Sequence, residues 1–276
     1  MLKNINFKLS CKNTIKKQFL VIYQENSYEN ELIDIFRTNS SSYIELMGKD
    51  NFYYYAQKIE PEIGNQRDAW FGRFGEFYSV KKILNICGGS NIIEIIPESS
   101  KKSERTPDIK LNNDLAIIEI YTPNYINLES FDGNLDIDLI LRSPIKTFIE
   151  GRKRKIDQLT MYEHANTFKK KIGWVNTSFF KFTPFGIPIP PAENIWSELI
   201  KCDELRIILK SIYDCHVKTK LDSNTFIILC LPTFAEGLDI DYFIKFDNNG
   251  FDILTSSELK SIILEVPDNI EDELND

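Results

Sequence analysis

Apolar residues recur at helical spacing between Asn65 and Ile86, in the segment NQRDAWFGRFGEFYSVKKILNI. The apolar positions that share one helical face are 70, 74, 77, 80, 83 and 84. Gly88 and Gly89 follow, and glycine readily adopts the left-handed conformation that ends many helices. The pattern therefore predicts a long helix over 65–86 with one face packed into a core.

Shorter apolar runs predict strands at 92–97, 173–182 and 224–232. Residues 107–123, PDIKLNNDLAIIEIYTP, predict two strands joined by a tight turn at Asn112-Asn113. Helical periodicity returns over 143–171, where Pro144 suits the first turn of a helix. This order of elements predicts an α/β fold in which a mixed central β-sheet is flanked by helices.

The same patterns divide the chain of 276 residues into three parts. Residues 1–60 form an N-terminal extension to which the sequence assigns no role, and residues 61–240 form the main domain. Residues 241–276 hold a further strand and helix and an acidic tail. The length suits one large domain with extensions.

The composition is that of a soluble globular protein, with 42% hydrophobic and 27% charged residues. No apolar run approaches the roughly 18 residues that a membrane span needs, and the first residues lack the pattern of a signal peptide. We therefore expect a cytoplasmic protein with no membrane contact. The five cysteines form no C-x-x-C pair, which argues against a disulfide framework or a structural zinc site.

The net charge of −8 does not favour nucleic-acid binding, but basic residues are clustered. The clusters lie at 101–105, 151–155 and 168–174. Together they are able to form a groove that accepts phosphates. Each cluster alone is better explained as solvated surface charge.

Glu119 is an acid inside an otherwise apolar strand, AIIEIYTPN. With a two-residue loop at 112–113, Asp108 lies opposite Ile117, and alternation places Ile117, Glu119 and Tyr121 on the face that Asp108 also occupies. Asp108 and Glu119 then become diagonal neighbours. Two buried carboxylates repel one another unless a cation or a shared proton compensates, and oxygen ligands suit Mg²⁺ or Mn²⁺. The alternative is a one-sided sheet from which Glu119 points into solvent.

The segment TPDIKLNNDLAIIEIYTP resembles the core of the PD-(D/E)XK nuclease superfamily, which includes many restriction endonucleases and repair nucleases. Pro107 and Asp108 match the PD, and Glu119 matches the acid on the next strand. Glu76 occupies the place of the glutamate that the family commonly carries on a preceding helix. The resemblance covers 65–235 and implies a restriction-endonuclease-like core.

Tyr121 departs from the family pattern, which has a lysine two residues after the strand acid. Tyrosine supplies no cation at neutral pH. In a helix over 145–165, Lys155 shares one face with Gln158 and Tyr162, and Arg152 lies at the margin of that face. Gln158-x-x-x-Tyr162 also resembles a helix motif of the exonuclease branch, and members of the superfamily are known to move the lysine to a helix. The alternative is an amphipathic helix with solvated basic residues.

The resemblance implies a role for each of these residues in catalysis. Asp108, Glu119 and the backbone carbonyl of Ile120 would hold Mg²⁺, or Mn²⁺ in its place, and Glu76 would bind it directly or through a water. Lys155 would orient the attacking water or stabilise the developing negative charge.

The remaining polar residues have supporting roles in this interpretation. Gln158 and Tyr162 would position Lys155 or contact the phosphate backbone, and Tyr121 and Arg152 would support them. Lys110, on the predicted hairpin, is the second choice for the cation.

The expected function is that of a Mg²⁺-dependent endonuclease, of a restriction or other defence type, that hydrolyses phosphodiester bonds of double-stranded DNA. The alternative is a catalytically inactive relative that binds nucleic acid or a protein, as Tyr121 and the acidic net charge suggest. The proline-rich segment 183–194 and the first 60 residues are candidates for target recognition or for a homodimer interface.

Overall fold

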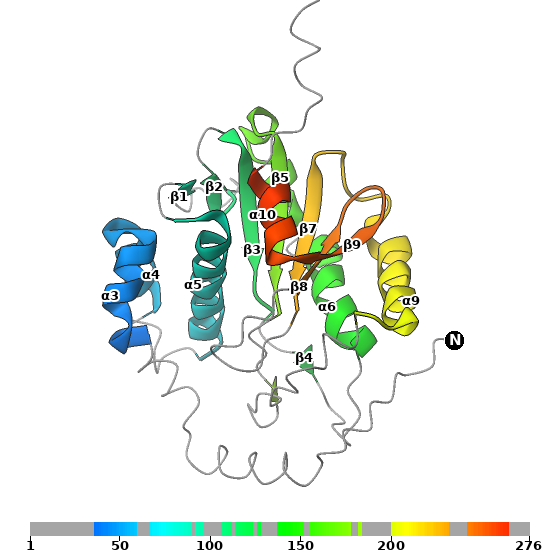
Figure 1. Cartoon of the computed structure of the whole chain (residues 1–276), viewed down its shortest axis with the longest axis horizontal. Helices are drawn as coiled ribbons and strands as arrows, with labels where there is room; N and C mark the ends of the chain where they lie inside the picture. Colours follow the sequence, from blue (N-terminus) through cyan, green and yellow to red (C-terminus); the bar gives the residue numbers. More distant parts are fainter. Residues whose placement is uncertain are drawn as a thin grey trace, which may run out of the picture.

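A seven-stranded β-sheet between two layers of helices organises the described part of the chain (Figure 1). The structure is a computed structural model. It describes residues 36–59, 67–89, 92–96, 106–111, 114–123, 126–127, 137–151, 155–177, 182–183, 200–231 and 242–264. The expectation of an α/β fold with a mixed central sheet and flanking helices is confirmed.

The strand order of the sheet is β1-β2-β3-β5-β7-β8-β9. The strands are β1 Ile93–Ile95, β2 Ile109–Leu111, β3 Ala116–Tyr121, β5 Lys170–Asn176, β7 Thr225–Cys230, β8 Tyr242–Phe246 and β9 Phe251–Thr255. The central strands β3, β5 and β7 are parallel to one another, and all other neighbouring pairs are antiparallel. A separate parallel pair is formed by β4 (Ile126–Asn127) and β6 (Phe182–Thr183).

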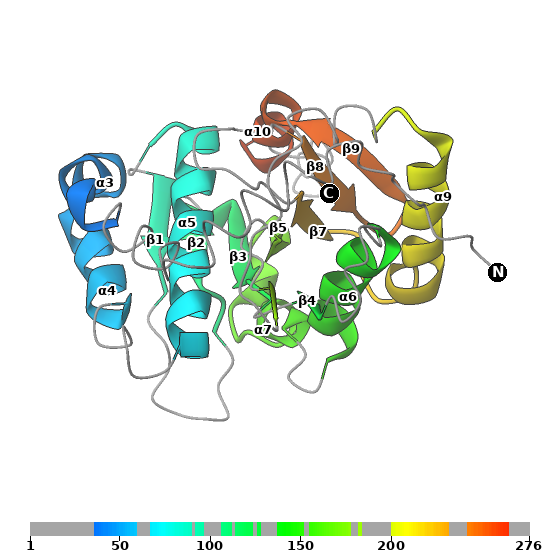
Figure 2. The ribbon, with the colours of Figure 1, turned by 90° about the horizontal axis from the view of Figure 1, so that it is seen from below.

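Helices cover both faces of the sheet and enclose one hydrophobic cluster on each (Figure 2). The first face carries α3 Ser40–Met47, α4 Lys49–Ile59, α5 Arg67–Cys87 and α10 Ser256–Leu264. The second face carries α6 Ile137–Glu150, α7 Ile156–Thr160, α9 Asp203–Ile212 and the π-helical turn Tyr213–Val217. The central strands are buried on both sides, and β7, with the sequence TFIILC, accordingly reads as a nearly continuous apolar run.

Residues 36–59 contribute to the same core as the sheet. Met47, Tyr55 and Ile59 are fully buried in the cluster that also contains Phe74 and Phe77 of α5. The domain boundaries predicted near residues 60 and 240 fall outside the described residues. No helix in the described ranges is both long and apolar enough to cross a membrane.

The long predicted helix is present as α5, and it ends as its glycines suggest. Gly88 and Gly89 have φ angles of +98° and +125°, and both amides donate to the carbonyl of Leu84. A side chain is strained at such angles, so glycine is the residue that fits there.

The predicted helix over 143–171 is wrong in its bounds and its continuity. α6 begins at Ile137, so that Pro144 lies inside the helix rather than in its first turn. The helix ends at Glu150, where Gly151 follows, and the chain then forms the short α7 before β5 begins at Lys170. Glycine lowers helix propensity, so a break at Gly151 has a local cause that the apolar periodicity does not show.

The hairpin register is also displaced from the prediction, by two residues. Lys110, and not Asp108, pairs with Ile117. The loop between β2 and β3 has four residues rather than two, and its Asp114 has a φ of +53°, which aspartate tolerates better than most residues. Because side chains alternate along a strand, a shift of two residues preserves the predicted faces.

Gly75 allows α5 to lie close to the end of β3. A methyl group at this position would place Thr122 Oγ1 only 2.6 Å and Thr122 Cβ only 2.9 Å away. The carbonyl of Gly75 accepts hydrogen bonds from Ser79 Oγ at 2.7 Å and from Asn176 Nδ2 at 3.1 Å. The absence of a side chain at Gly75 therefore sets how close Glu76, the next residue, comes to the sheet.

We expect Gly75→Ala to destabilise the protein by about 1–3 kcal/mol, the usual cost of overpacking a filled interior. At an open helix position the same change would stabilise by about 0.5–1 kcal/mol. Urea unfolding measures the difference. Thr122→Ala removes Cγ2 and Oγ1 of Thr122, which are the two atoms nearest to the added methyl group, so the double variant should recover part of the loss. A Gly75→Ala protein at least as stable as wild type would contradict this description of the contact.

Candidate functional site

The candidate site begins where β3 extends beyond β2. The paired residues of the two strands are Ile109 with Ile118 and Lys110 with Ile117, so residues 119–121 of β3 have no partner in β2. This leaves a gap in the sheet beside Glu119 and Ile120. The same residues remain paired with β5 on their other side.

Asp108 lies in this gap, one residue before β2. Its backbone amide donates to the carbonyl of Ile118 at 3.1 Å, and its carboxylate Oδ2 accepts from the amide of Ile120 at 2.6 Å. Asp108 is therefore bonded to the residues on both sides of Glu119, and its side chain replaces the missing strand as a partner of Ile120. The two acids are neighbours, as the sequence predicts.

Glu119 is completely buried, and its two oxygens differ in their contacts. Oε1 forms an ion pair with the ammonium of Lys155. Oε2 is buried and has no hydrogen-bond partner among the described residues. The alternative in which Glu119 points into solvent is excluded by its burial.

Lys155 reaches Glu119 from the position just before α7. Burial lowers the pKa of its ammonium, but Glu119, Asp108 and Glu76 outweigh burial and raise the pKa above its ordinary value. Lys155 is therefore a cation at neutral pH. The structure thus brings a lysine from a helix to the acids, in place of one at Tyr121.

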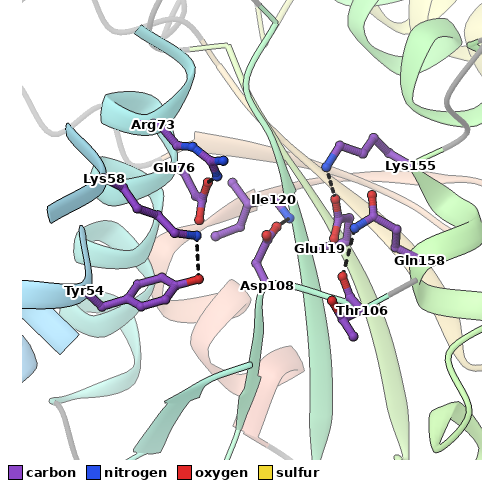
Figure 3. A network of polar contacts seen from close by, with 10 residues as sticks. All are labelled: Tyr54, Lys58, Arg73, Glu76, Thr106, Asp108, Glu119, Ile120, Lys155 and Gln158. Carbon is purple, nitrogen blue, oxygen red and sulfur yellow. Dashed lines mark hydrogen bonds and ion pairs between the residues drawn. The ribbon is translucent and has the colours of Figure 1, made fainter. Parts of the chain in front are cut away.

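Glu76 approaches the same point from α5, on the opposite face of the sheet. Figure 3 shows the carboxylate of Asp108 between those of Glu76 and Glu119. Arg73 Nη1 lies 3.4 Å from Glu76 Oε2, one helical turn away. Side chains from both helical layers thus meet at the gap beside β3.

Burial dominates the electrostatics of all three acids. It raises the pKa of Glu76 to about 7, and the nearby Asp108 adds to this rise. Burial and then Asp108 raise the pKa of Glu119 well above its ordinary value. Burial also raises the pKa of Asp108, although Lys155 and the Ile120 amide oppose that rise. Each ionised carboxylate here has lost part of the hydration that would stabilise its negative charge in water.

This donor set fits a hydrated divalent cation. In the described ranges, no three Asp, Glu, His or Cys side chains converge into a complete metal cage. Mg²⁺ does not need one, since it keeps several waters and is usually held by one or two carboxylates. Glu119 Oε2 is a buried carboxyl oxygen that has no hydrogen-bond partner in the described part of the chain, and Asp108 is beside it. The Ile120 carbonyl points to the same side of β3 as its amide, toward Asp108.

Gln158 and Tyr162 do not share the face that a continuous helix would give them. Gln158 is within one turn of Lys155 and donates from Nε2 to the carbonyl of Thr106 at 2.8 Å. It therefore ties α7 to the chain just before Pro107 and Asp108. Tyr162 lies beyond the end of α7 and packs edge-on against His164, with ring centroids 5.5 Å apart.

Of the other predicted supporting residues, Tyr121 lies near Lys155, whereas Lys110 is paired elsewhere and Arg152 lies outside the described ranges. Tyr121 is half-buried against Phe148, and its ring centroid lies 6.2 Å from that ring. Lys110, the second choice for the cation, pairs with Glu94 at 3.0 Å. Arg152 lies in 152–154, outside the described residues.

Four residues near the acids were missed by sequence reasoning: Tyr54, Lys58 and Arg73, which Figure 3 shows, and Tyr55. Arg73 had a detectable signal, since it precedes Glu76 by three positions in a predicted helix. The other three lie on α4, and only the packing of α4 on α5 brings them to the site.

The raised pKa of Glu76 predicts how stability depends on pH without metal. The unfolded carboxyl titrates near 4.5 and the folded one near 7, so the folded state holds the extra proton between these values. Stability should fall as pH rises through this window. Glu76→Gln has no proton to lose, so at pH 8 its free energy of unfolding should exceed that of wild type by roughly 3 kcal/mol, at 1.36 kcal/mol per pKa unit.

Urea unfolding in EDTA at pH 5, 6, 7 and 8 measures this effect. Glu45→Gln, on an exposed position of α3, serves as the matched control and should follow the wild-type profile. A Glu76→Gln profile that runs parallel to wild type would contradict the raised pKa.

Comparisons of the chain with protein-family models, with curated proteins and with solved structures found no match. The functional assignment therefore depends on the arrangement of residues around Glu119.

Proposed function

We propose that this protein is a Mg²⁺-dependent DNA endonuclease, of a restriction or other defence type, with Asp108, Glu119 and Lys155 at its centre. The observation that carries the proposal is the ion pair between Lys155 and the buried Glu119, beside Asp108. In the PD-(D/E)XK nucleases that the sequence resembles, two acids and a lysine form the motif. Lys155 supplies the lysine that Tyr121 does not.

Asp108, the unpartnered oxygen of Glu119 and the Ile120 carbonyl would hold the cation, and Glu76 would bind it directly or through a water. When bound, Mg²⁺ polarises the phosphate and lowers the pKa of a coordinated water. The acids would supply negatively charged oxygen ligands at a buried position that few water molecules reach. Their raised pKa values indicate that a cation would be strongly favoured there.

Lys155 has the charge and the position for transition-state stabilisation. Its ammonium is held beside the carboxylates by Glu119 and remains protonated at neutral pH. A fixed cation next to the attacked phosphate would orient the attacking water or stabilise the negative charge that develops. Gln158 would keep the Asp108 segment in register with α7 through its bond to Thr106.

A catalytically inactive binding protein is the second candidate. The same ion pair favours it, because Lys155 compensates Glu119 without any metal. In that case the cluster would be a structural charge network, and no divalent cation would change its chemistry.

A cleavage assay separates the two candidates. Supercoiled plasmid, labelled duplex and labelled single strands are incubated with Mg²⁺ or Mn²⁺, and nicking or shortening is followed on gels. We expect wild type to cleave, and Asp108→Ala and Lys155→Ala each to lower the rate by about 100-fold or more. Lys210→Ala removes a lysine that is 72% exposed on α9 and should cleave as wild type does.

Full activity in Asp108→Ala and Lys155→Ala would show that the site is assigned wrongly. Wild-type protein that cleaves no nucleic acid with either cation would favour the inactive binding protein.

A further inference from the structure

A second lysine faces the three acids from the side opposite Lys155. Lys58 projects from the last turn of α4, and Figure 3 shows its ammonium beside Glu76 and Asp108, while Lys155 approaches Glu119 from the far side. Lys58 lies close enough to lower the pKa of both Glu76 and Asp108. It comes from a segment outside the 65–235 range of the family resemblance.

Tyr54 holds Lys58 in this position. The Lys58 ammonium donates to Tyr54 Oη at 2.6 Å and lies 4.2 Å from the centroid of the same ring. The two residues are one helical turn apart, so the contact fixes the direction in which the flexible lysine points. Lysine loses much rotational freedom when it is held in this way, which is a cost that a solvated surface lysine does not have.

A neighbouring buried hydroxyl also lacks a partner. Tyr55 is completely buried between α4 and α5, and its hydroxyl has no hydrogen-bond partner among the described residues. Burial is the largest cause that raises the pKa of this hydroxyl, and the negative charges of the nearby Glu76 and Asp108 raise it further. Unpaired buried polar groups are rare, and here one lies next to the acids. α4 therefore contributes polar groups to the site as well as packing.

The charge balance indicates which ligand this side of the site would accept. Among the described residues, when all are ionised, the three carboxylates face three cations, namely Lys58, Arg73 and Lys155. A bound divalent cation would leave the cluster positive, and a phosphate would complement that charge. Lys58 and Lys155 lie on opposite sides of the acids, so the two ammonium groups would meet a phosphate backbone at two different points.

We propose that Lys58 is a second phosphate-binding lysine of this site, which contacts the DNA strand on the side opposite Lys155, and that Tyr54 is its positioning residue. The proposal rests on the proposed nuclease function. It extends the site to α4 and predicts that this helix takes part in substrate binding.

The test measures DNA binding rather than cleavage. A fluorescein-labelled DNA duplex is titrated with protein by anisotropy, in Ca²⁺ and in EDTA, from 50 to 200 mM NaCl. We expect Lys58→Ala to weaken binding by about tenfold, as for one lost charge-assisted hydrogen bond. The slope of log Kd against log salt should fall by about 0.9, the value for one phosphate contact.

Lys49→Ala is the matched control. Lys49 is on the same helix and also lies over a tyrosine ring, 5.8 Å from the centroid of Tyr53. It lies nine positions before Lys58, on the other side of α4, and should leave the salt slope unchanged. Lys58→Arg should restore most of the slope, since it keeps the charge. Thermal unfolding of each variant verifies that it is folded.

Tyr54→Phe keeps the ring but removes the hydroxyl that accepts from Lys58. It should weaken binding by less than Lys58→Ala, and the double variant should bind no more weakly than Lys58→Ala alone. Additive losses would overturn the positioning role of Tyr54.

The outcomes for Lys58 and for the nuclease function are distinguishable. If wild type cleaves DNA but Lys58→Ala binds as Lys49→Ala does, the role of Lys58 is overturned and the nuclease function stands. If wild type binds DNA without cleaving it, and Lys58→Ala lowers the slope of log Kd against log salt as expected, only the nuclease function is overturned. If wild type does not bind the duplex at all, both are overturned.

Discussion

The burial of Glu119 is the constraint on which the rest of the site depends. An ionised carboxylate inside a sheet loses its hydration, and the loss must be offset by charge or by hydrogen bonds. The Lys155 ammonium offsets it at one oxygen and nothing among the described residues does so at the other. The same requirement applies to the other two acids. Asp108 accepts a hydrogen bond from the Ile120 amide, and Glu76 forms an ion pair with Arg73.

The sheet leaves a gap that helices on both of its faces reach. β2 has three residues and begins after Asp108, so β3 continues without a neighbour on that side. α5 and α4 reach the gap from the first hydrophobic cluster, and α7 reaches it from the second. Each helix is anchored in its own core, for example by Tyr55 or by Leu159, and this keeps charged groups from opposite layers in a fixed relation.

The pattern of apolar and polar residues was sufficient to predict those parts of the site that depend on a single helix or hairpin. The spacing of apolar residues predicts α5 and hence the place of Glu76, and alternation along the hairpin brings Asp108 and Glu119 together even though the register differs. The break at Gly151 was missed because apolar periodicity continues across it. Lys58 could not be found, since its place depends on how α4 packs against α5 rather than on any spacing within α4. The contact between Lys155 and Glu119 is predicted only with the help of the family resemblance, because Tyr121 stands where the family pattern has a lysine.

If these acids hold a divalent cation, as we propose, anomalous diffraction from crystals soaked in Mn²⁺ should show one peak in the gap beside β3, with Asp108, Glu119 and the Ile120 carbonyl as its ligands. Cleavage plays no part in this measurement, so it tests the site independently of the substrate. Well-ordered crystals soaked to saturation that show no peak at this position would contradict the claim.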